Sequence, residues 1–160
     1  MNPAKRLWVV PLALGALASS AIVEAQEALV GSWVLDPASS TAPPGMMPTT
    51  ATLEVNDAGG GKYTSVNEGT VGGVTGHSEI TYSIDGKDYA VTSTPAQPGA
   101  ITQSIERVSE AVYKSSVKLN GQSVATAVTQ ISGDGKTLMQ TTTGIGQFAA
   151  LSMTMVFRRK

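Results

Sequence analysis

The sequence indicates an all-β protein, a single up-and-down antiparallel barrel of about ten strands, preceded by a signal peptide. Short segments that alternate apolar and polar residues follow one another from residue 30 to the end of the chain, and glycine-containing turns join several of them. No segment has the apolar spacing of an amphipathic helix. With an even number of strands, the last can run antiparallel to the first and pair with it, which closes the barrel without a bare edge.

The first 25 residues have the layout of a secretory signal peptide. Two basic residues precede an apolar run of 12 residues, 7–18, and a small-residue cleavage site lies before Gln26. Twelve residues are too few to cross a bilayer as a helix, which takes about 20. No cysteine follows the run, so a lipid-modified N-terminus is not expected. We expect residues 1–25 to be removed and the mature chain to be periplasmic or secreted, with no membrane span.

The composition limits the partners and the source of stability that we expect for the mature domain, residues 26–160. The whole chain has a formal net charge of −1 at pH 7, and removal of Lys5, Arg6 and Glu24 leaves no basic surplus, so nucleic acid is not an expected partner. The chain has no cysteine, so its stability is expected to come from apolar burial and the hydrogen bonds of the sheet. No repeat is longer than the Asp-Gly-Lys turn shared by residues 85–87 and 134–136. We expect one domain and a monomer.

The first five candidate strands lie between residues 30 and 91. They cover residues 30–36, 50–56, a segment around Tyr63, residues 74–84 and a segment around Tyr89 and Val91. The second shows the pattern most plainly, because apolar and polar residues alternate along it. Between the first two, residues 37–48 carry four prolines and Met46-Met47, which predicts neither a helix nor a central strand there. Asp85-Gly86 predicts a tight hairpin turn before the fifth strand.

The other five candidate strands follow a break at residues 95–99. They cover residues 101–107, 111–119, 123–131, 136–142 and a last segment from about residue 150, in which Leu151, Met153, Met155 and Phe157 share one face. Asn120-Gly121 and Asp134-Gly135 are hairpin turn signals between them.

The faces expected to point inward are only partly apolar. Ser65, Ser78, Gln103 and Gln140 fall in register with leucine or isoleucine neighbours. Packed dry between two sheets, such polar groups would cost free energy. A barrel that holds water or a ligand satisfies their hydrogen bonds instead. The pattern therefore favours an internal cavity.

Gly31-Ser32-Trp33 on the first strand resembles the opening signature of the calycins, the superfamily of lipocalins and fatty-acid-binding proteins. Arg158 and Arg159 on the last strand resemble the closing half of that signature. The chain is also similar to small exported lipocalin-like proteins of bacteria. The resemblance implies that Gly31 and Trp33 close one barrel end with Arg159, or alternatively Arg158. That cation would pack over the tryptophan ring for about 1–2 kcal/mol.

Two differences from that superfamily narrow the chemical class of ligand that the resemblance implies. Intracellular fatty-acid binders insert a helical pair between strands one and two, whereas residues 37–48 leave the mouth open or covered by an irregular loop. Those binders also hold the ligand carboxylate with an Arg-x-Tyr pair on the final strand, and the matching positions here are Met155 and Phe157. A fatty-acid carboxylate is therefore not implied, and a neutral apolar molecule suits these side chains better.

We predict that the protein binds a small apolar molecule in an internal cavity, is not an enzyme, and uses neither a cofactor nor a metal. The residues predicted to form the cavity wall are Leu53, Tyr63, Ile80, Tyr82, Tyr89, Ile105, Met153, Met155 and Phe157. One alternative is a packed, ligand-free interaction module of the cell envelope with an exposed apolar patch around Met46-Met47. Another is a small-barrel isomerase or cyclase, for which only Tyr63, Tyr82 and Tyr89 offer an interior acid or base.

Three further features admit both a functional and a structural interpretation. His77 is the single histidine and is expected on the outer surface, so catalytic triads and histidine metal sites are not supported. The methionines could bind copper, but the alternation of Met153 and Met155 with polar residues indicates core positions. Arg107 could face a ligand, with Glu68 or a bound anion as its partner, or could be an exposed strand end.

Overall fold

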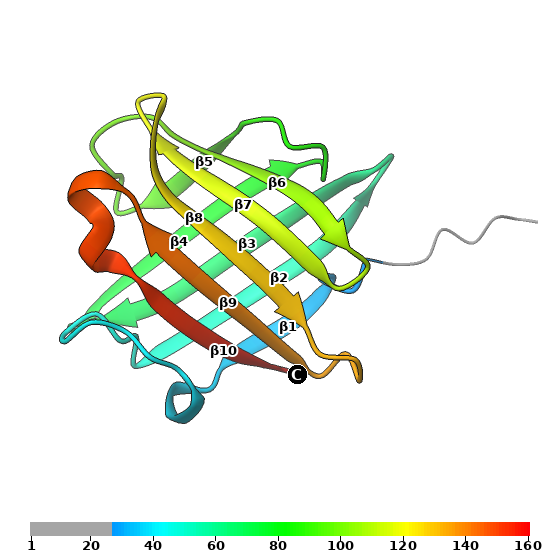
Figure 1. The fold of residues 1–160 in the computed structure, drawn as a ribbon, viewed down its shortest axis with the longest axis horizontal. Coiled ribbons are helices and arrows are strands. Elements are labelled where there is room, and N and C mark those ends of the chain that lie inside the picture. The colour runs from blue at the N-terminus through cyan, green and yellow to red at the C-terminus, as the bar shows by residue number, and fades with distance from the viewer. Residues whose placement is uncertain (1–26) are drawn as a thin grey trace, which may run out of the picture.

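The last strand of the chain pairs with the first and closes a barrel of ten antiparallel strands (Figure 1). The structure, a computed structural model, describes residues 27–160, so the predicted signal peptide at residues 1–25 lies outside the described residues. The strands are β1 (Gly31–Leu35), β2 (Thr50–Gly59), β3 (Lys62–Val71), β4 (Val74–Tyr82), β5 (Tyr89–Thr94), β6 (Ile101–Ser109), β7 (Val112–Leu119), β8 (Gln122–Ile131), β9 (Thr137–Gly144) and β10 (Met153–Arg159). Neighbours in the chain are neighbours in the sheet, so the predicted up-and-down order is confirmed.

The seam between β1 and β10 joins the two ends of the sheet. Trp33 stands opposite Arg159 in the ladder, and Leu35 stands opposite Phe157. The pairing continues beyond β1, because the backbone of Thr41 forms a bridge with Thr154. Because β1 also pairs with β2, each strand within residues 27–160 has a neighbour on both sides.

The two ends of the barrel differ. Residues 27–30 and the turns before β3, β5, β7 and β9 lie at one end, which we call the closed end. The loops before β2, β4, β6, β8 and β10 lie at the other end, the mouth. The largest fully buried side chains come from strand positions toward the closed end: Trp33, Val55, Tyr82, Tyr113 and Leu138. The densest part of the core therefore lies at the closed end.

Two turns at the closed end use the same chemistry, in agreement with their shared Asp-Gly-Lys sequence. Asp85 Oδ1 accepts a hydrogen bond from the backbone N–H of Lys87 at 3.0 Å, and Asp134 Oδ1 accepts one from Lys136 at 3.0 Å. The glycine in each turn takes a positive φ, +75° in the first and +68° in the second. These aspartates are turn residues, as predicted.

The segment before β10 corrects the prediction of a last strand from about residue 150. Residues Gly146–Leu151 form a 3-10 helix, η2, and β10 begins only at Met153, so Leu151 is not on the strand. The glycine that ends β9 explains the packing of this helix. A Cβ at Gly144 would collide with the backbone carbonyl of Phe148 in η2. The bare glycine therefore lets η2 lie against the end of β9, beside the mouth.

The connector between β1 and β2 also contains a short helix that its proline content does not predict. This 3-10 turn, η1, covers Pro37–Ser39. Proline stands in its first turn, where the missing N–H needs no partner. The backbone N–H of Ser40 then donates to the Pro37 carbonyl at 3.2 Å and ends the turn.

Candidate functional site

Two adjoining cavities occupy the interior between the closed end and the mouth. The central cavity has a volume of about 270 Å³. The mouth cavity, which is bordered mainly by β3, β4, β5 and β6, has a volume of about 360 Å³. Asn67, Gln103 and Val117 line both cavities, so the two spaces meet at these residues. Side chains do not fill the interior, in contrast to what the packed-barrel alternative predicts.

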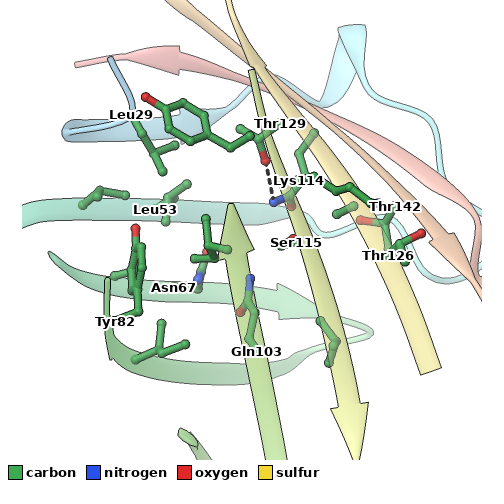
Figure 2. Close-up of a pocket in the computed structure, with 18 of the residues that line it drawn as sticks. Leu29, Leu53, Asn67, Tyr82, Gln103, Lys114, Ser115, Thr126, Thr129 and Thr142 are labelled. Atoms are coloured by element: carbon green, nitrogen blue, oxygen red, sulfur yellow. Dashed lines mark hydrogen bonds between the residues drawn. The ribbon is translucent and has the colours of Figure 1, made fainter. Parts of the chain in front are cut away.

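The wall of the central cavity mixes apolar and uncharged polar side chains (Figure 2). Its apolar members include Leu53, Val55, Ile80, Ile105, Val117 and Ala127. Its polar members include Ser65, Asn67, Gln103, Ser115, Thr129 and Gln140. Ser78 lines the mouth cavity. The four polar residues predicted to face inward, Ser65, Ser78, Gln103 and Gln140, therefore all border a cavity.

Charged side chains lie outside this interior. Lys114 is the one charged residue on the described wall of the central cavity, and it sits between buried Tyr113 and Ser115 on β7. The alternation of a strand turns its amine outward, where it lies 3.8 Å from the Glu106 carboxylate and its side chain is 54% exposed. The side chains that point into the described cavities are therefore uncharged or titrate far from neutral pH.

Two tyrosines near the closed end remain protonated at neutral pH. Burial raises the pKa of Tyr82 and of Tyr113 above the usual value. Ser65 Oγ donates to the Tyr82 hydroxyl at 3.1 Å, and the Tyr113 hydroxyl donates to Glu27 Oε2 at 2.7 Å. On the opposite wall, Gln140 Nε2 donates to Thr129 Oγ1 at 3.2 Å.

The nine predicted wall residues fall into three groups. Those that line the central cavity are Leu53, Ile80, Tyr82 and Ile105. Those that pack, partly buried, against the apolar core without lining either cavity are Tyr63, Tyr89 and Met153. Met155 and Phe157 are buried within that core and do not line a cavity. Ligand contact by any of them stays a prediction.

Several wall residues went unpredicted because they are polar or small. Asn67 follows Ser65 by two positions on β3, and Ser115 follows Tyr113 by two on β7, so strand alternation places each on the inner face. Thr129 and Ala127 precede the buried Ile131 on β8 in the same way. Strand alternation alone therefore indicates that these residues face inward, whereas the predicted wall contains only apolar and aromatic side chains.

Arg159, rather than Arg158, covers Trp33 at the closed end. Its guanidinium carbon lies 4.1 Å from the centre of the tryptophan ring. The same group donates to three backbone carbonyls, those of Gly135 at 2.6 Å, Val30 at 2.8 Å and Ala28 at 3.0 Å. A Cβ at Gly31, whose φ is +146°, would collide with this guanidinium. Glycine at position 31 therefore makes room for the stacked arginine.

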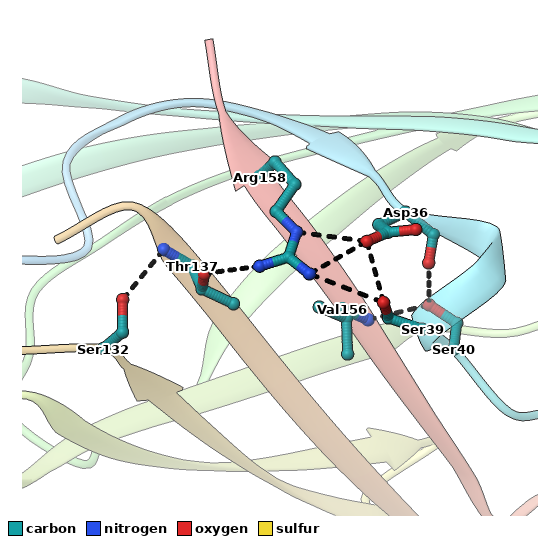
Figure 3. A network of polar contacts seen from close by, with 7 residues as sticks. All are labelled: Asp36, Ser39, Ser40, Ser132, Thr137, Val156 and Arg158. Atoms are coloured by element: carbon teal, nitrogen blue, oxygen red, sulfur yellow. Dashed lines mark hydrogen bonds and ion pairs between the residues drawn. The ribbon is translucent and has the colours of Figure 1, made fainter. Parts of the chain in front are cut away.

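Arg158 lies on the outer face and fastens the connector that follows β1 (Figure 3). Its Nε and Nη2 contact Asp36 Oδ2 at 3.1 and 3.0 Å, and its Nη1 donates to Thr137 Oγ1 at 2.8 Å. The Ser39 hydroxyl, and next the Arg158 guanidinium, hold the pKa of Asp36 below its usual value. Ser40 Oγ accepts the buried backbone N–H of Val156 at 2.9 Å. The connector is thus tied to β10.

Arg107 has a partner that the sequence prediction did not name. It forms an ion pair with Glu27, whose side chain is 9% exposed, while Glu68 contacts His77 at 3.9 Å instead. Glu27 also accepts the Tyr113 hydrogen bond, so residues 27–30 are bound to the barrel through Arg107, Tyr113 and the carbonyls that meet Arg159. Glu27 rather than Glu68 is therefore the carboxylate that pairs with Arg107, and the 47% exposure of the Arg107 side chain agrees with its interpretation as an exposed strand end.

Met46 and Met47 lie in the connector between β1 and β2. Met47 packs against the apolar core and Met46 is half-buried, so they do not form the exposed patch of the packed-barrel alternative. Within residues 27–160, no three His, Asp or Glu side chains gather as metal ligands would. None of the described helices has the length and apolar character required to cross a bilayer.

No family model matches the sequence, and no curated protein matches it either. The fold is nevertheless similar to solved structures. A point mutant of the fluorescent protein UnaG superposes with a TM-score of 0.60 and 18% sequence identity over 84% of this chain and 97% of that one. A Schistosoma mansoni fatty acid binding protein in complex with arachidonic acid gives a TM-score of 0.58, 16% identity, and coverage of 83% and 96%. A second UnaG point mutant gives a TM-score of 0.57, 20% identity, and coverage of 83% and 96%. The predicted calycin-like barrel is therefore confirmed as a fold.

Proposed function

We propose that this barrel binds a small, predominantly apolar, uncharged molecule in its interior and releases it chemically unchanged. The observation that carries the proposal is the hollow interior of two adjoining cavities, walled by aliphatic side chains and uncharged polar groups. The likeness to a fatty acid binding protein solved with arachidonic acid supports the same type of activity. Apolar contact supplies about 25 cal/mol per Å² of buried ligand surface before the entropic cost of binding.

The charges around the cavity favour an uncharged ligand over a fatty-acid anion. The arginine that could reach the interior from β6, Arg107, is neutralised by Glu27. Arg159 directs its donors to three backbone carbonyls. An anion inside the barrel would therefore lose its water without gaining a paired cation, which costs several kcal/mol.

Export of the protein as a monomeric binder is part of the proposal. The basic start and the apolar run at residues 7–18 support a cleavable signal. Glu27, the second residue of the proposed mature chain, already contacts the barrel through Arg107 and Tyr113. The mass of the intact protein purified from its own host measures the cleavage site, and native mass spectrometry of the same sample reports its oligomeric state and any co-purified molecule.

A pair of substitutions on one strand tests the cavity itself. Ala127→Phe fills the central cavity, because Ala127 is 6% exposed and lines it. Val128→Phe adds the same ring to the outer face, where Val128 is 46% exposed. With Nile red as an apolar fluorescent probe, we expect uptake by the wild type and by Val128→Phe and its loss in Ala127→Phe. Absence of Nile red uptake by the wild type, together with no co-purified molecule, contradicts the proposal. Equal uptake by both variants contradicts the location.

A further inference from the structure

Two side-chain amides stand where the central cavity meets the mouth cavity. Asn67 comes from β3 and Gln103 from β6, and both residues line both cavities. Figure 2 shows the two amides in the same region of the cavity, on strands that are not neighbours in the sheet. A molecule that extends from one cavity into the other therefore passes beside these two residues and Val117.

These two amides differ from Ser65 and Gln140, two other polar residues of the wall, whose side chains are hydrogen-bonded within the protein. Ser65 bonds to Tyr82, and Gln140 bonds to Thr129. The side chains of Asn67 and Gln103 have no hydrogen-bond partner among residues 27–160. Each amide offers two N–H donors and one carbonyl acceptor. The junction therefore carries hydrogen-bonding capacity that the protein itself leaves unused.

The same junction offers little to a charged group. The titratable side chain on the described wall of the mouth cavity is that of His77, on the outer face of β4 and beside Glu68. A carboxylate could take hydrogen bonds from the two amides but would have no counter-charge inside the described barrel. An uncharged group takes the same bonds without that desolvation cost.

We infer that the ligand of this barrel carries an uncharged hydrogen-bonding head group, an amide, carbonyl or hydroxyl, which Asn67 and Gln103 bind at the junction of the two cavities. The apolar part of the molecule then lies in the central cavity against residues such as Leu53, Ile80 and Ile105. This inference rests on the proposed function and adds the chemical class of the ligand and the residues that select it.

Displacement of Nile red tests the inference with two probes of equal chain length. Decanamide has an uncharged head that donates and accepts hydrogen bonds, and decanoate is ionised at about pH 8. We expect decanamide to displace Nile red from the wild type at lower concentration than decanoate. Because decanoate is also the more polar molecule, substitutions at the two amides decide the question.

Asn67→Leu and Gln103→Leu each remove one amide while keeping a side chain of similar size. We expect each to weaken decanamide binding about five- to tenfold, with decanoate and Nile red affinity little changed. Thr64→Val and Thr102→Val, on the outer faces of β3 and β6, are the matched controls and should bind as the wild type does. Should a leucine variant fail to fold, Asn67→Ala and Gln103→Ala remove the same amides without adding bulk.

The outcomes separate this inference from the proposed function. If the amide variants bind Nile red normally and decanamide within about twofold of wild type, the head-group assignment is wrong while the binding function stands. Equal competition by decanoate and decanamide in the wild type also overturns the assignment. If the wild type takes up neither Nile red nor decanamide, both the inference and the proposed function fail.

Discussion

Arg159 lies over the ring of Trp33, with 4.1 Å between the guanidinium carbon and the ring centre, and the two residues face each other across the seam between the last and the first strand. The stack therefore joins the two edges that must meet for the barrel to close. The backbone carbonyls of Val30 and Ala28, which accept from the same guanidinium, belong to the segment that covers the closed end. One side chain thus holds the seam and the cover together.

Arg159→Ala should destabilise the protein much more than Arg158→Ala. Removing Arg159 loses the stack and three hydrogen bonds to carbonyls, for an expected cost of about 2–3 kcal/mol. Removing Arg158 loses the ion pair with Asp36 and the hydrogen bond to Thr137, both on the exposed outer face, and exposed pairs contribute little. Urea unfolding of the two variants measures the difference, and equal destabilisation would show that the stack contributes no special stability.

Gly31→Ala should be destabilising chiefly because of Arg159. The new Cβ would collide with the guanidinium, and the φ of +146° is unfavourable for alanine. We expect a loss of about 2 kcal/mol in the wild-type background and a smaller loss in an Arg159→Ala background, where the collision is gone. Thermal unfolding of the four proteins of this double-mutant cycle gives the coupling. Purely additive losses would assign the whole effect to backbone strain.

Glu27→Ala should loosen the cover of the closed end without opening the barrel. The change removes the partner of Arg107 and the acceptor of the Tyr113 hydroxyl. We expect a loss of about 1–2 kcal/mol, smaller for Glu27→Gln, because a glutamine carbonyl can still accept from Tyr113. Hydrogen exchange should speed up at residues 27–33 and stay unchanged in β6 and β7. Faster exchange throughout the barrel would contradict this local role.

Acid should destabilise the barrel through aspartates that are held in their charged form. The pKa of Asp36 lies below the usual 3.8, first because of the Ser39 hydroxyl and then because of Arg158. The pKa of Asp134 is lowered first by the Ser132 hydroxyl. A lowered pKa in the folded state stabilises the fold above the unfolded-state value, and this contribution is lost as the pH falls through the folded-state value.

The free energy of unfolding should therefore change little above about pH 5 and fall as the pH drops below 3.8. Urea unfolding at a series of pH values measures the profile. An Asp36→Asn, Asp134→Asn double variant should be less stable near neutral pH and show a shallower acid slope. An unchanged slope in that variant would mean that other groups govern acid unfolding.

The strands could be predicted because apolar and polar residues alternate along them, which is a property of the local sequence. The closure of the barrel could be predicted because Gly31 and Trp33 form a recognisable pair. The end of the chain was harder to place, since residues 150–157 alternate as a strand would throughout. Residues Gly146–Leu151 form a 3-10 helix whose Phe148 carbonyl lies close over Gly144, a backbone contact that apolar periodicity does not reveal.

The candidate site was predicted only in part for a related reason. Alternation tells which face a side chain takes, and it placed Leu53, Ile80 and Ile105 correctly on the inner face. It does not tell how neighbours fill the space around a side chain, so Met155 and Phe157 face inward yet lie in packed core. The partner of Arg107 also escaped prediction, because Glu27 is far from it in the sequence and precedes the first strand.

Both ends of the described chain lie at the closed end of the barrel. Glu27 is bound there by Arg107, and the backbone N–H of Lys160 donates to the Ser32 carbonyl at 2.9 Å. An affinity tag, a fused domain or a surface tether attached after Lys160 would therefore lie at the end of the barrel opposite the mouth. Immobilising the protein through its C-terminus therefore leaves the mouth unobstructed.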